Sequence, residues 1–557
     1  MNNYSNEQNY YAAQYWLFKQ FGGARGEQKW KTFHHNGVLF PPEYVPHKIP
    51  VLYDGKPVSL EPGQEEMATI FAKYTDTEYM NNKVFKKNFW EDWKKILGKN
   101  NTIQSLDKCN FGNIYNYIIE QKEIKNSIPK EEKKKEKELK DQAEEKYKTA
   151  YVDGKPQPVG NFRVEPPGIF IGRGCHPKLG KIKRRVYAED IILNLSKDAP
   201  IPKPPKGHEW GEVINDNTVE WLASWKDEIT GKIKYVWLAA HSDMKAKGDK
   251  EKFDKARELK KKIKKIRETN DKNLSSSDIK LKQTATALYF IDNLALRVGN
   301  EKGEDEADTV GVTSLRVEHI KLNERNNITL DFLGKDSINY VKTFSVPDII
   351  YDNISEFMEG KKMDEALFDR INSNDMNKYL QSFMDNLTAK VFRTFNASDL
   401  FQKELDKITK KYDGYDMDDK VNILLDEFNK ANFQVALLCN HQKNVSKNFD
   451  SQIDKINDNI KELKKKLKEE KNKDDKGEKH KQRIKKIKDS IEKLEAKKGI
   501  KIQMKNISLG TSKINYIDPR ITVAFMKKHD LPVDKIFSKT LQERFKWSFE
   551  VDENYKF

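Results

Sequence analysis

Residues 453–494 read IDKINDNIKELKKKLKEEKNKDDKGEKHKQRIKKIKDSIEKL. Apolar residues recur there in two runs, at steps of three and four positions: Ile453, Ile456, Ile460, Leu463 and Leu467, then Ile484, Ile487, Ile491 and Leu494. Such steps place each run on one face of an α-helix. A polar segment with Gly477 separates the runs, and most other positions are Lys, Glu or Asp. We therefore predict an antiparallel pair of helices that project into water and touch through their apolar faces.

The segments on either side of this pair, and further toward the N-terminus, carry residues suited to phosphate chemistry. Each stands in an unusual context, beside an apolar run where an unpaired charge is costly, or at a predicted turn. The segments are LALRVGNE (294–301) with Arg297, DFLGKDSINY (331–340) with Lys335, LTAKVFRTFNAS (387–398) with Arg393, VALLCNHQ (435–442) with His441 and SKINYIDPR (512–520) with Tyr516.

Transfer of a phosphodiester without a metal needs a nucleophile, cations for the non-bridging oxygens and an acid for the leaving oxygen. Tyr can supply the first, Arg the second, and His or Lys the second or third. Taken singly, however, each residue also fits a structural role. An Arg at a helix end can cap the helix or form a salt bridge. A His after an apolar helix can lie in the core, and a Tyr before Asp-Pro can pack against neighbouring side chains. Spacing alone does not bring the five together.

The rest of the chain alternates between strand-like and helix-like patterns. We expect a mixed α+β fold, and 557 residues suggest roughly three or four domains. The expected elements are short strands over 29–60, helix over 61–97, a helix over 246–270 with Phe253, Ala256, Leu259, Ile263 and Ile266 on one stripe, an apolar helix over 280–299, strands near 311–345 and helices to about 444.

Composition narrows the functional class. Lys and Arg (103) exceed Asp and Glu (87), giving a net charge of +16, which favours a polyanionic partner but also occurs in Lys-rich proteins that are simply soluble. The three Cys residues are scattered without a CxxC pair, so we expect neither a disulfide framework nor a zinc site. P-loop, dinucleotide-fold and HExxH motifs are missing, and we predict no cofactor and no metal. No signal peptide or membrane-length apolar stretch occurs, so we expect a soluble intracellular protein.

Together and in order, the five segments resemble signature stretches of the eukaryotic type IB topoisomerases. SLRVEHI, near the middle of the chain, resembles that family as well, as do three segments of the N-terminal half. These three are KWKTFHHNGVLFPPEY (29–44), FRVEPPGIFIGRGCHPKLGKIKRRV (162–186) and GHEWGEV (207–213). The resemblance covers roughly residues 27–557 and includes a charged helical hairpin before the tyrosine segment.

The resemblance implies an α+β, multidomain fold in the form of a bilobed DNA clamp. The expected parts are a polar N-terminal tail (1–26), a mixed α/β cap lobe (27–242), a mainly helical catalytic lobe with a small sheet (243–444), a protruding antiparallel hairpin linker (445–505) and a small C-terminal domain (506–557).

It also implies a role for each of the five residues. Tyr516 would be the nucleophile and form a 3′-phosphotyrosyl bond. Arg297, Arg393 and His441 would bind the phosphate and its transition state, and Lys335 would be the general acid. The implied activity is ATP- and metal-independent relaxation of supercoiled duplex DNA by nicking, rotation and religation.

The resemblance finally implies a set of DNA contacts and a partner. The expected contacts are Arg173, His176, Lys178, Lys181, Lys183, Arg184, Asp336 and Asn515; of these, Arg173, Asp336 and Asn515 match positions that contact the drug camptothecin. Duplex DNA would be the partner of a monomer that touches no membrane and lies in the nucleus. Two other readings stay open: a tyrosine recombinase or integrase, which uses a similar residue set, and a non-catalytic DNA-binding clamp.

Overall fold

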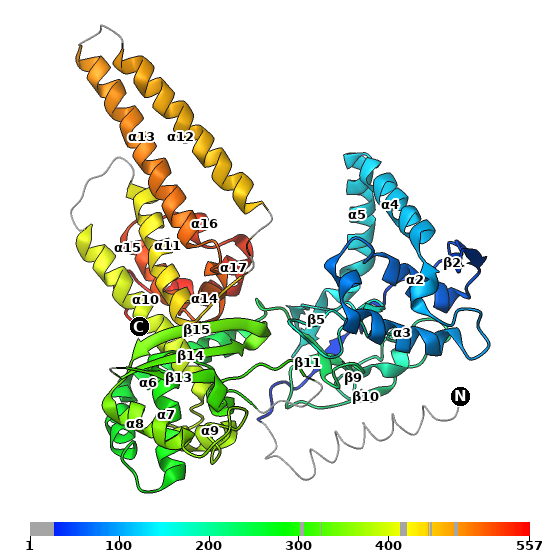
Figure 1. The fold of residues 1–557 in the computed structure, drawn as a ribbon, viewed down its shortest axis with the longest axis horizontal. Helices are drawn as coiled ribbons and strands as arrows, with labels where there is room; N and C mark the ends of the chain where they lie inside the picture. Colours follow the sequence, from blue (N-terminus) through cyan, green and yellow to red (C-terminus); the bar gives the residue numbers. More distant parts are fainter. Residues whose placement is uncertain are drawn as a thin grey trace. The chain divides into compact units, whose positions relative to one another are not determined.

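A computed structural model describes residues 27–300, 306–324, 326–412, 420–443, 445, 448–472 and 477–557. The polar tail expected over 1–26 lies outside these residues. Contacts divide the chain into two compact units. The first unit holds Met1–Asp249 and Lys302–Thr309, and the second holds Lys250–Glu301 and Val310–Phe557. Both units combine helices with small sheets (Figure 1), so the expected mixed, multidomain fold is confirmed.

The first unit contains four small sheets and four α-helices within its described residues. The sheets have the strand orders β1-β5-β6, β3-β2-β4, β7-β8 and β10-β9-β11-β12, and all pairings are antiparallel except the parallel pair of β9 and β10. The strands are β1 (Phe33–His35), β2 (Val51–Tyr53), β3 (Lys56–Val58), β4 (Cys109–Asn110), β5 (Thr149–Val152), β6 (Lys155–Pro158), β7 (Gly168–Ile169), β8 (Ile182–Lys183), β9 (Ile192–Asn194), β10 (Glu212–Ile214), β11 (Trp221–Lys226) and β12 (Ile233–Trp237). The helices are α2 (Pro62–Ala72), α3 (Lys83–Leu97), α4 (Gly112–Ser127) and α5 (Lys130–Glu144).

Two apolar cores hold the first unit together, one among the larger sheets and one around α2 and α3. Helix α3 illustrates why the local sequence folds as it does. Asn82 caps its N-terminus by accepting hydrogen bonds from the backbone N–H groups of Val84 and Phe85. Gly98 follows its last residue with a φ of 81°, a conformation that favours glycine. Between these ends, Phe85, Phe89, Trp93 and Leu97 repeat every four residues and are buried against the core.

In its described residues the second unit is mainly helical and has one three-stranded antiparallel sheet in the order β13-β14-β15. Helix α6 begins in the first unit and continues into the second. No helix in the described part of the chain is long and apolar enough to cross a membrane. The elements are α6 (Asp243–Asn273), α7 (Ile279–Asn293), β13 (Ile320–Asn323), β14 (Asn327–Gly334), β15 (Ile338–Ser345), α8 (Asp348–Met358), α9 (Ser373–Gln381), α10 (Ala389–Lys411), α11 (Lys420–Leu438), α12 (Phe449–Lys471), α13 (Glu478–Gln503), α14 (Leu509–Asn515), α15 (Pro519–Lys528), α16 (Val533–Ile536) and α17 (Lys539–Arg544).

One large core joins most elements of the second unit. It takes residues from α6, α7, α10, α11, α15 and all three strands. The stripe predicted on α6 is confirmed, because its five apolar residues are all buried. The core therefore fixes the positions of the helix ends and the strand turn that carry the candidate site residues.

The apolar helix predicted over 280–299 is shorter than expected. Helix α7 ends at Asn293, because Ala295 adopts a left-handed φ of 49° that no α-helix can contain. Gly299 has a φ of 88° and packs against the backbone of Gly311, where a Cβ atom would have no room. Arg297 thus lies in a tightly folded segment after α7 and not on its last turn.

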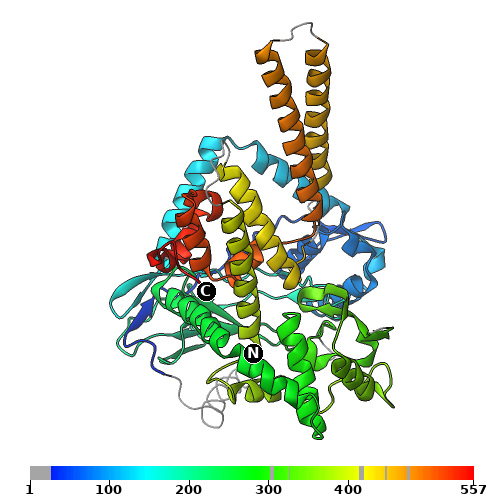
Figure 2. The ribbon, with the colours of Figure 1, turned by 90° about the vertical axis from the view of Figure 1, so that its left-hand side faces the viewer.

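Helices α12 and α13 run side by side as an antiparallel pair (Figure 1 and Figure 2, orange). Ile456, Ile460 and Ile491 are buried between them and form an apolar cluster separate from the main core. Ion pairs cross the pair of helices, from Lys464 Nζ to Glu495 at 2.7 Å and from Arg483 to Glu470 at 3.1 Å.

Candidate active site

A pocket of about 160 Å³ in the second unit collects most of the candidate residues. Its walls come from six segments of the chain: the residues after α7, Val310 and Gly311, the turn between β14 and β15 with the adjoining strand ends, α10, the end of α11 with the residues after it, and Thr511 of α14. Four of the five predicted catalytic residues line it, together with Asp336: they are Arg297, Lys335, Arg393 and His441.

The fifth residue, Tyr516, touches three of the four. It follows the last residue of α14, and its hydroxyl oxygen accepts a hydrogen bond of 3.2 Å from Arg297 Nη2. Its ring stacks on the ring of His441, with centroids 5.3 Å apart and an interplanar angle of 23°. The guanidinium carbon of Arg393 lies 5.1 Å from the centre of the same ring. A tyrosine hydroxyl and three nitrogen-bearing side chains therefore meet at one point.

Arg393 is the buried member of the group, with 6% of its surface exposed. It projects from α10 and donates hydrogen bonds to two carbonyl oxygens, at 2.9 Å to that of Ala295 and also to that of Cys439. Among the described residues no carboxylate pairs with it, and its Nε has no partner. Burial lowers the pKa of Arg393, but a guanidinium stays charged in proteins. The pocket thus holds a desolvated cation, which attracts an anion strongly.

His441 lies beside this cation and is itself buried. Its Nδ1 is 2.6 Å from the hydroxyl oxygen of Ser512, and its Nε2 has no hydrogen-bond partner. Burial above all, and then the positive charges of Arg393 and Arg297, lower the pKa of His441 to about 3. The ring is therefore neutral at physiological pH and carries one N–H group.

Lys335 and Asp336 lie in the turn between β14 and β15, as the sequence predicted for Lys335. Asp336 and Ser337 have left-handed φ angles of 69° and 56°, which close the turn. Both Lys335 and Asp336 are exposed at the pocket wall. Asn515 is also exposed, directly before Tyr516, and its side-chain amide donates to the carbonyl oxygen of Thr511 at 3.2 Å.

The remaining predicted DNA contacts lie in the first unit, in and after a glycine-rich loop. Arg173 is exposed between Gly172 and Gly174. A side chain at Gly172 would place its Cβ 2.3 Å from the Cβ of His176, so the loop can close only with glycine there. The backbone N–H of Lys178 donates to His176 Nδ1 at 3.1 Å, and Lys178 Nζ donates to the carbonyl oxygen of Ile229 at 2.9 Å.

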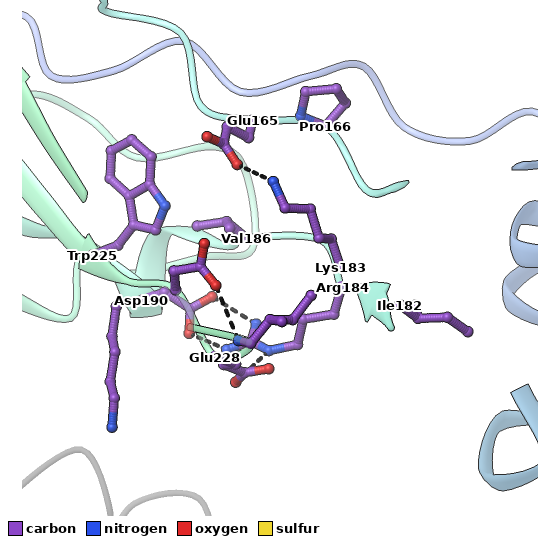
Figure 3. A pocket seen from close by; sticks show the side chains of 12 residues that line it. Glu165, Pro166, Ile182, Lys183, Arg184, Val186, Asp190, Trp225 and Glu228 are labelled. Atoms are coloured by element: carbon purple, nitrogen blue, oxygen red, sulfur yellow. Dashed lines mark hydrogen bonds and ion pairs between the residues drawn. The ribbon is translucent and has the colours of Figure 1, made fainter. Parts of the chain in front are cut away.

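Several basic side chains after this loop are paired with carboxylates. Figure 3 shows Lys183 and Arg184 on the wall of a small pocket in the first unit. Lys183 Nζ lies 2.7 Å from Glu165, and Arg184 lies 2.8 Å from Asp190 and 2.6 Å from Glu228. Lys181 pairs in the same way with Glu91 and Asp92, each at 3.2 Å. A DNA phosphate would have to compete with these carboxylates, so the predicted DNA contacts of these residues stay predictions.

Sequence reasoning missed four groups that hold the site. Ser512 contacts His441, and the hydroxyl of Ser398 donates to the carbonyl oxygen of Tyr516 at 3.0 Å. The carbonyl oxygens of Ala295 and Cys439 receive Arg393. The two serines left no signal, because a serine within a helix is common and only a contact in the folded chain marks it. A backbone carbonyl leaves none.

Comparison with known protein families gives matches along most of the chain. Residues 28–238 match the family model described as eukaryotic DNA topoisomerase I, DNA binding fragment, and residues 241–474 match its catalytic core. Residues 488–557 match the C-terminal topoisomerase domain. The pocket residues other than Thr511 fall within the catalytic-core match, and Thr511 and Tyr516 fall within the C-terminal one.

Individual relatives agree with the family models. The chain is 48% identical to DNA topoisomerase 1 alpha and 46% identical to DNA topoisomerase 1 beta of Arabidopsis thaliana, over 96% and 97% of its length. It is 43% identical to DNA topoisomerase 1 of Homo sapiens over 95% of its length. The alignments cover 60% of each Arabidopsis protein and 72% of the human one.

Replacing His441 with Gln is expected to make the second unit less sensitive to mild acid. The pKa of His441 is lowered to about 3 in the folded chain, from 6.5. Between these values the unfolded state binds a proton that the folded state does not, so stability falls as the pH falls. From pH 7 to pH 5, uptake of this proton by the unfolded state lowers the free energy of unfolding by about 2 kcal/mol. Hydrogen exchange of α10 and α11 during denaturant titrations at both pH values measures the loss. An equal loss in wild type and His441→Gln would mean that the folded ring also takes up the proton.

Proposed function

We propose that this chain, which belongs to the family of eukaryotic DNA topoisomerases I, relaxes supercoiled duplex DNA by nicking one strand and rejoining it. The observation that carries the proposal is the contact of the Tyr516 hydroxyl with Arg297, beside a buried Arg393 and a neutral His441. That set combines a nucleophile with donors for the two non-bridging oxygens of a phosphodiester.

The first step is attack of the Tyr516 oxygen on phosphorus. The phenolic proton leaves to solvent, and Arg297, which donates a hydrogen bond of 3.2 Å to that oxygen, stabilises the negative charge that develops there. A bond forms between that oxygen and phosphorus, and the bond from phosphorus to the 5′ oxygen breaks, which leaves a 3′-phosphotyrosyl ester. Negative charge builds up on the non-bridging oxygens, and the guanidinium groups of Arg297 and Arg393 stabilise it. His441 adds a neutral N–H donor, since its lowered pKa keeps it uncharged.

The leaving 5′ oxygen needs a proton, and we assign its delivery to Lys335. This residue is exposed on a turn at the pocket wall, where its flexible side chain can reach toward the bound strand. Reversal of the attack rejoins the strand and returns the proton. Because the tyrosyl ester conserves the energy of the broken bond, the cycle needs no ATP. Because side chains supply the cations and the acid, the proposed cycle needs no metal.

The rest of the proposal concerns how DNA is held. The cap lobe (27–242) and the catalytic lobe (243–444) would enclose the duplex as a clamp, with α12 and α13 as the linker to the C-terminal segment. Between nicking and rejoining, torsional strain would drive rotation of the free strand end. Contacts to the phosphate backbone carry little sequence information, so binding should be sequence-tolerant and fall steeply with salt. We further propose that the chain acts as a monomer in the nucleus.

Tyr516→Phe should abolish nicking and leave DNA binding nearly intact, because it removes a single hydroxyl group. Tyr289→Phe is the matched control, since Tyr289 packs on the core of the same unit and its hydroxyl forms no hydrogen bond with the residues that the structure describes. Nicking of supercoiled plasmid and a DNA-binding titration, run on both variants, give the comparison. Relaxation that persists in Tyr516→Phe refutes the assignment of the nucleophile.

Lys335→Ala should slow cleavage of ordinary DNA by about 10²–10⁴-fold, the range of general acid catalysis. The loss should shrink strongly on a substrate whose leaving oxygen is replaced by sulfur, which departs without a proton. Lys342→Ala, an exposed lysine on the neighbouring strand β15, controls for the lost charge. Equal slowing by Lys335→Ala on both substrates rules out the acid role.

Camptothecin should trap the enzyme on nicked DNA. Asp336 lies on the pocket wall and Asn515 stands next to Tyr516, and Arg173 is exposed in the first unit. These are the three positions that match the drug contacts of the family. Covalent complexes captured with detergent should increase with drug concentration. If they do not accumulate, the roles assigned to these three residues are wrong.

A further inference from the structure

We propose that Ser512 is a positioning residue whose hydroxyl donates to Nδ1 of His441 and thereby keeps the imidazole proton on Nε2. The inference rests on the proposed function, because it assigns Nε2–H the task of binding a non-bridging phosphate oxygen. It adds a residue that acts through His441 without touching DNA.

The contact is short and enclosed. The hydroxyl oxygen of Ser512 lies 2.6 Å from His441 Nδ1, and Ser512 is fully buried. His441 lines the pocket, and its other ring nitrogen, Nε2, has no partner. A buried nitrogen without a partner is costly, which is the expected state of a donor that awaits a ligand.

Ser512 also holds the nucleophile through its backbone. Its carbonyl oxygen accepts hydrogen bonds from the N–H groups of Tyr516 at 2.9 Å and Ile517 at 3.0 Å. One residue of α14 therefore connects the segment that carries the nucleophile to the ring that binds the phosphate. A shift of α14 would disturb both together.

The tautomer of His441 decides whether its Nε2 attracts or repels a phosphate oxygen. A neutral imidazole has one N–H group, and the hydrogen bond at one nitrogen sets which nitrogen carries the proton. If the Ser512 hydroxyl donates to Nδ1, then Nε2–H can donate to a phosphate oxygen. If Nδ1–H donates to the Ser512 oxygen instead, the lone pair of Nε2 meets a negatively charged phosphate and repels it.

The surroundings remove the third state, a protonated ring. His441 is buried, and the positive charges that act on it come from Arg393 of α10 and Arg297 of the segment after α7, while Tyr516 covers its ring. Lys335 and Asp336 line the same pocket at its exposed wall. Burial and both arginines oppose a positive charge on the ring. The position of one proton on a neutral ring is thus the remaining variable, and Ser512 is the group placed to set it.

A double-mutant cycle tests the link. The measurement uses a short DNA whose fragment with the new 5′ end diffuses away after cleavage, so that the strand cannot be rejoined. Its single-turnover cleavage rate is compared for wild type, Ser512→Ala, His441→Ala and the double variant. Ser512→Ala should slow cleavage by about 10–100-fold, by analogy with the loss of the partner that orients a metal-bound histidine. DNA affinity should stay within about threefold of wild type, since a phosphate–histidine hydrogen bond is one contact among many. In the His441→Ala background, Ser512→Ala should cause no further slowing.

Ser398→Ala is the matched control. It also removes a buried serine hydroxyl beside Tyr516, where Ser398 donates to the tyrosine carbonyl oxygen, but it does not touch His441. Whatever slowing it causes should therefore persist unchanged in the His441→Ala background. If Ser512→Ala behaves like this control, Ser512 is only a structural residue and the proposal is overturned.

Nitrogen NMR of ¹⁵N-histidine-labelled protein reads the proton position directly, without activity. The chain has 10 His, and His441→Ala identifies the signals of His441 by their loss. We expect a protonated Nε2 and an unprotonated Nδ1 in wild type, and a mixture of both tautomers in Ser512→Ala. A proton on Nδ1 in wild type contradicts the proposal. Failure of wild type to cleave DNA would sink the proposed function instead, and the nitrogen spectrum would still decide the tautomer.

Discussion

A buried guanidinium organises the second unit. Arg393 enters the core from the second turn of α10 and reaches the carbonyl oxygens of Ala295 and Cys439, which belong to the segments after α7 and α11. Since a charge without polar partners cannot be buried at tolerable cost, these segments must fold so that their carbonyls face it. That requirement brings Arg297 and His441 close to Arg393, and Tyr516 contacts all three. Since carbonyl oxygens bind Arg393 without neutralising it, the pocket keeps its positive charge, and this charge makes the pocket suited to a phosphate.

Much of the fold could be predicted from periodicity. The stripe on α6, the turn that carries Lys335 and the two helices of 449–503 each follow from steps of two, three or four between apolar residues. The end of α7 could not be predicted, because the apolar pattern continues past Asn293. A left-handed conformation at Ala295 stops the helix, and nothing in the type of that residue announces it. The strained conformation at Ala295 is compensated in the folded chain, because it lets the carbonyl oxygen of Ala295 accept a hydrogen bond from Arg393.

Less of the candidate site than of the fold could be predicted from local sequence patterns. Arg297 and Tyr516 are 219 residues apart, and no local pattern says that they meet. Resemblance to a family supplied that step, and the structure gives it contacts in this chain. Resemblance did not supply Ser512, because a serine inside a short helix is common and only its distance from His441 distinguishes it. In the first unit, basic residues read from the sequence as DNA contacts lie beside carboxylates that the sequence places up to 90 positions away.

The central claim is that side chains alone carry out reversible cleavage of one strand. Relaxation of negatively and of positively supercoiled plasmid, with EDTA present and ATP absent, tests it most directly. The account predicts that both substrates relax through a ladder of closely spaced topoisomers. If neither relaxes while the plasmid is still bound, the account is contradicted, and a clamp without catalysis or a site-specific recombinase takes its place.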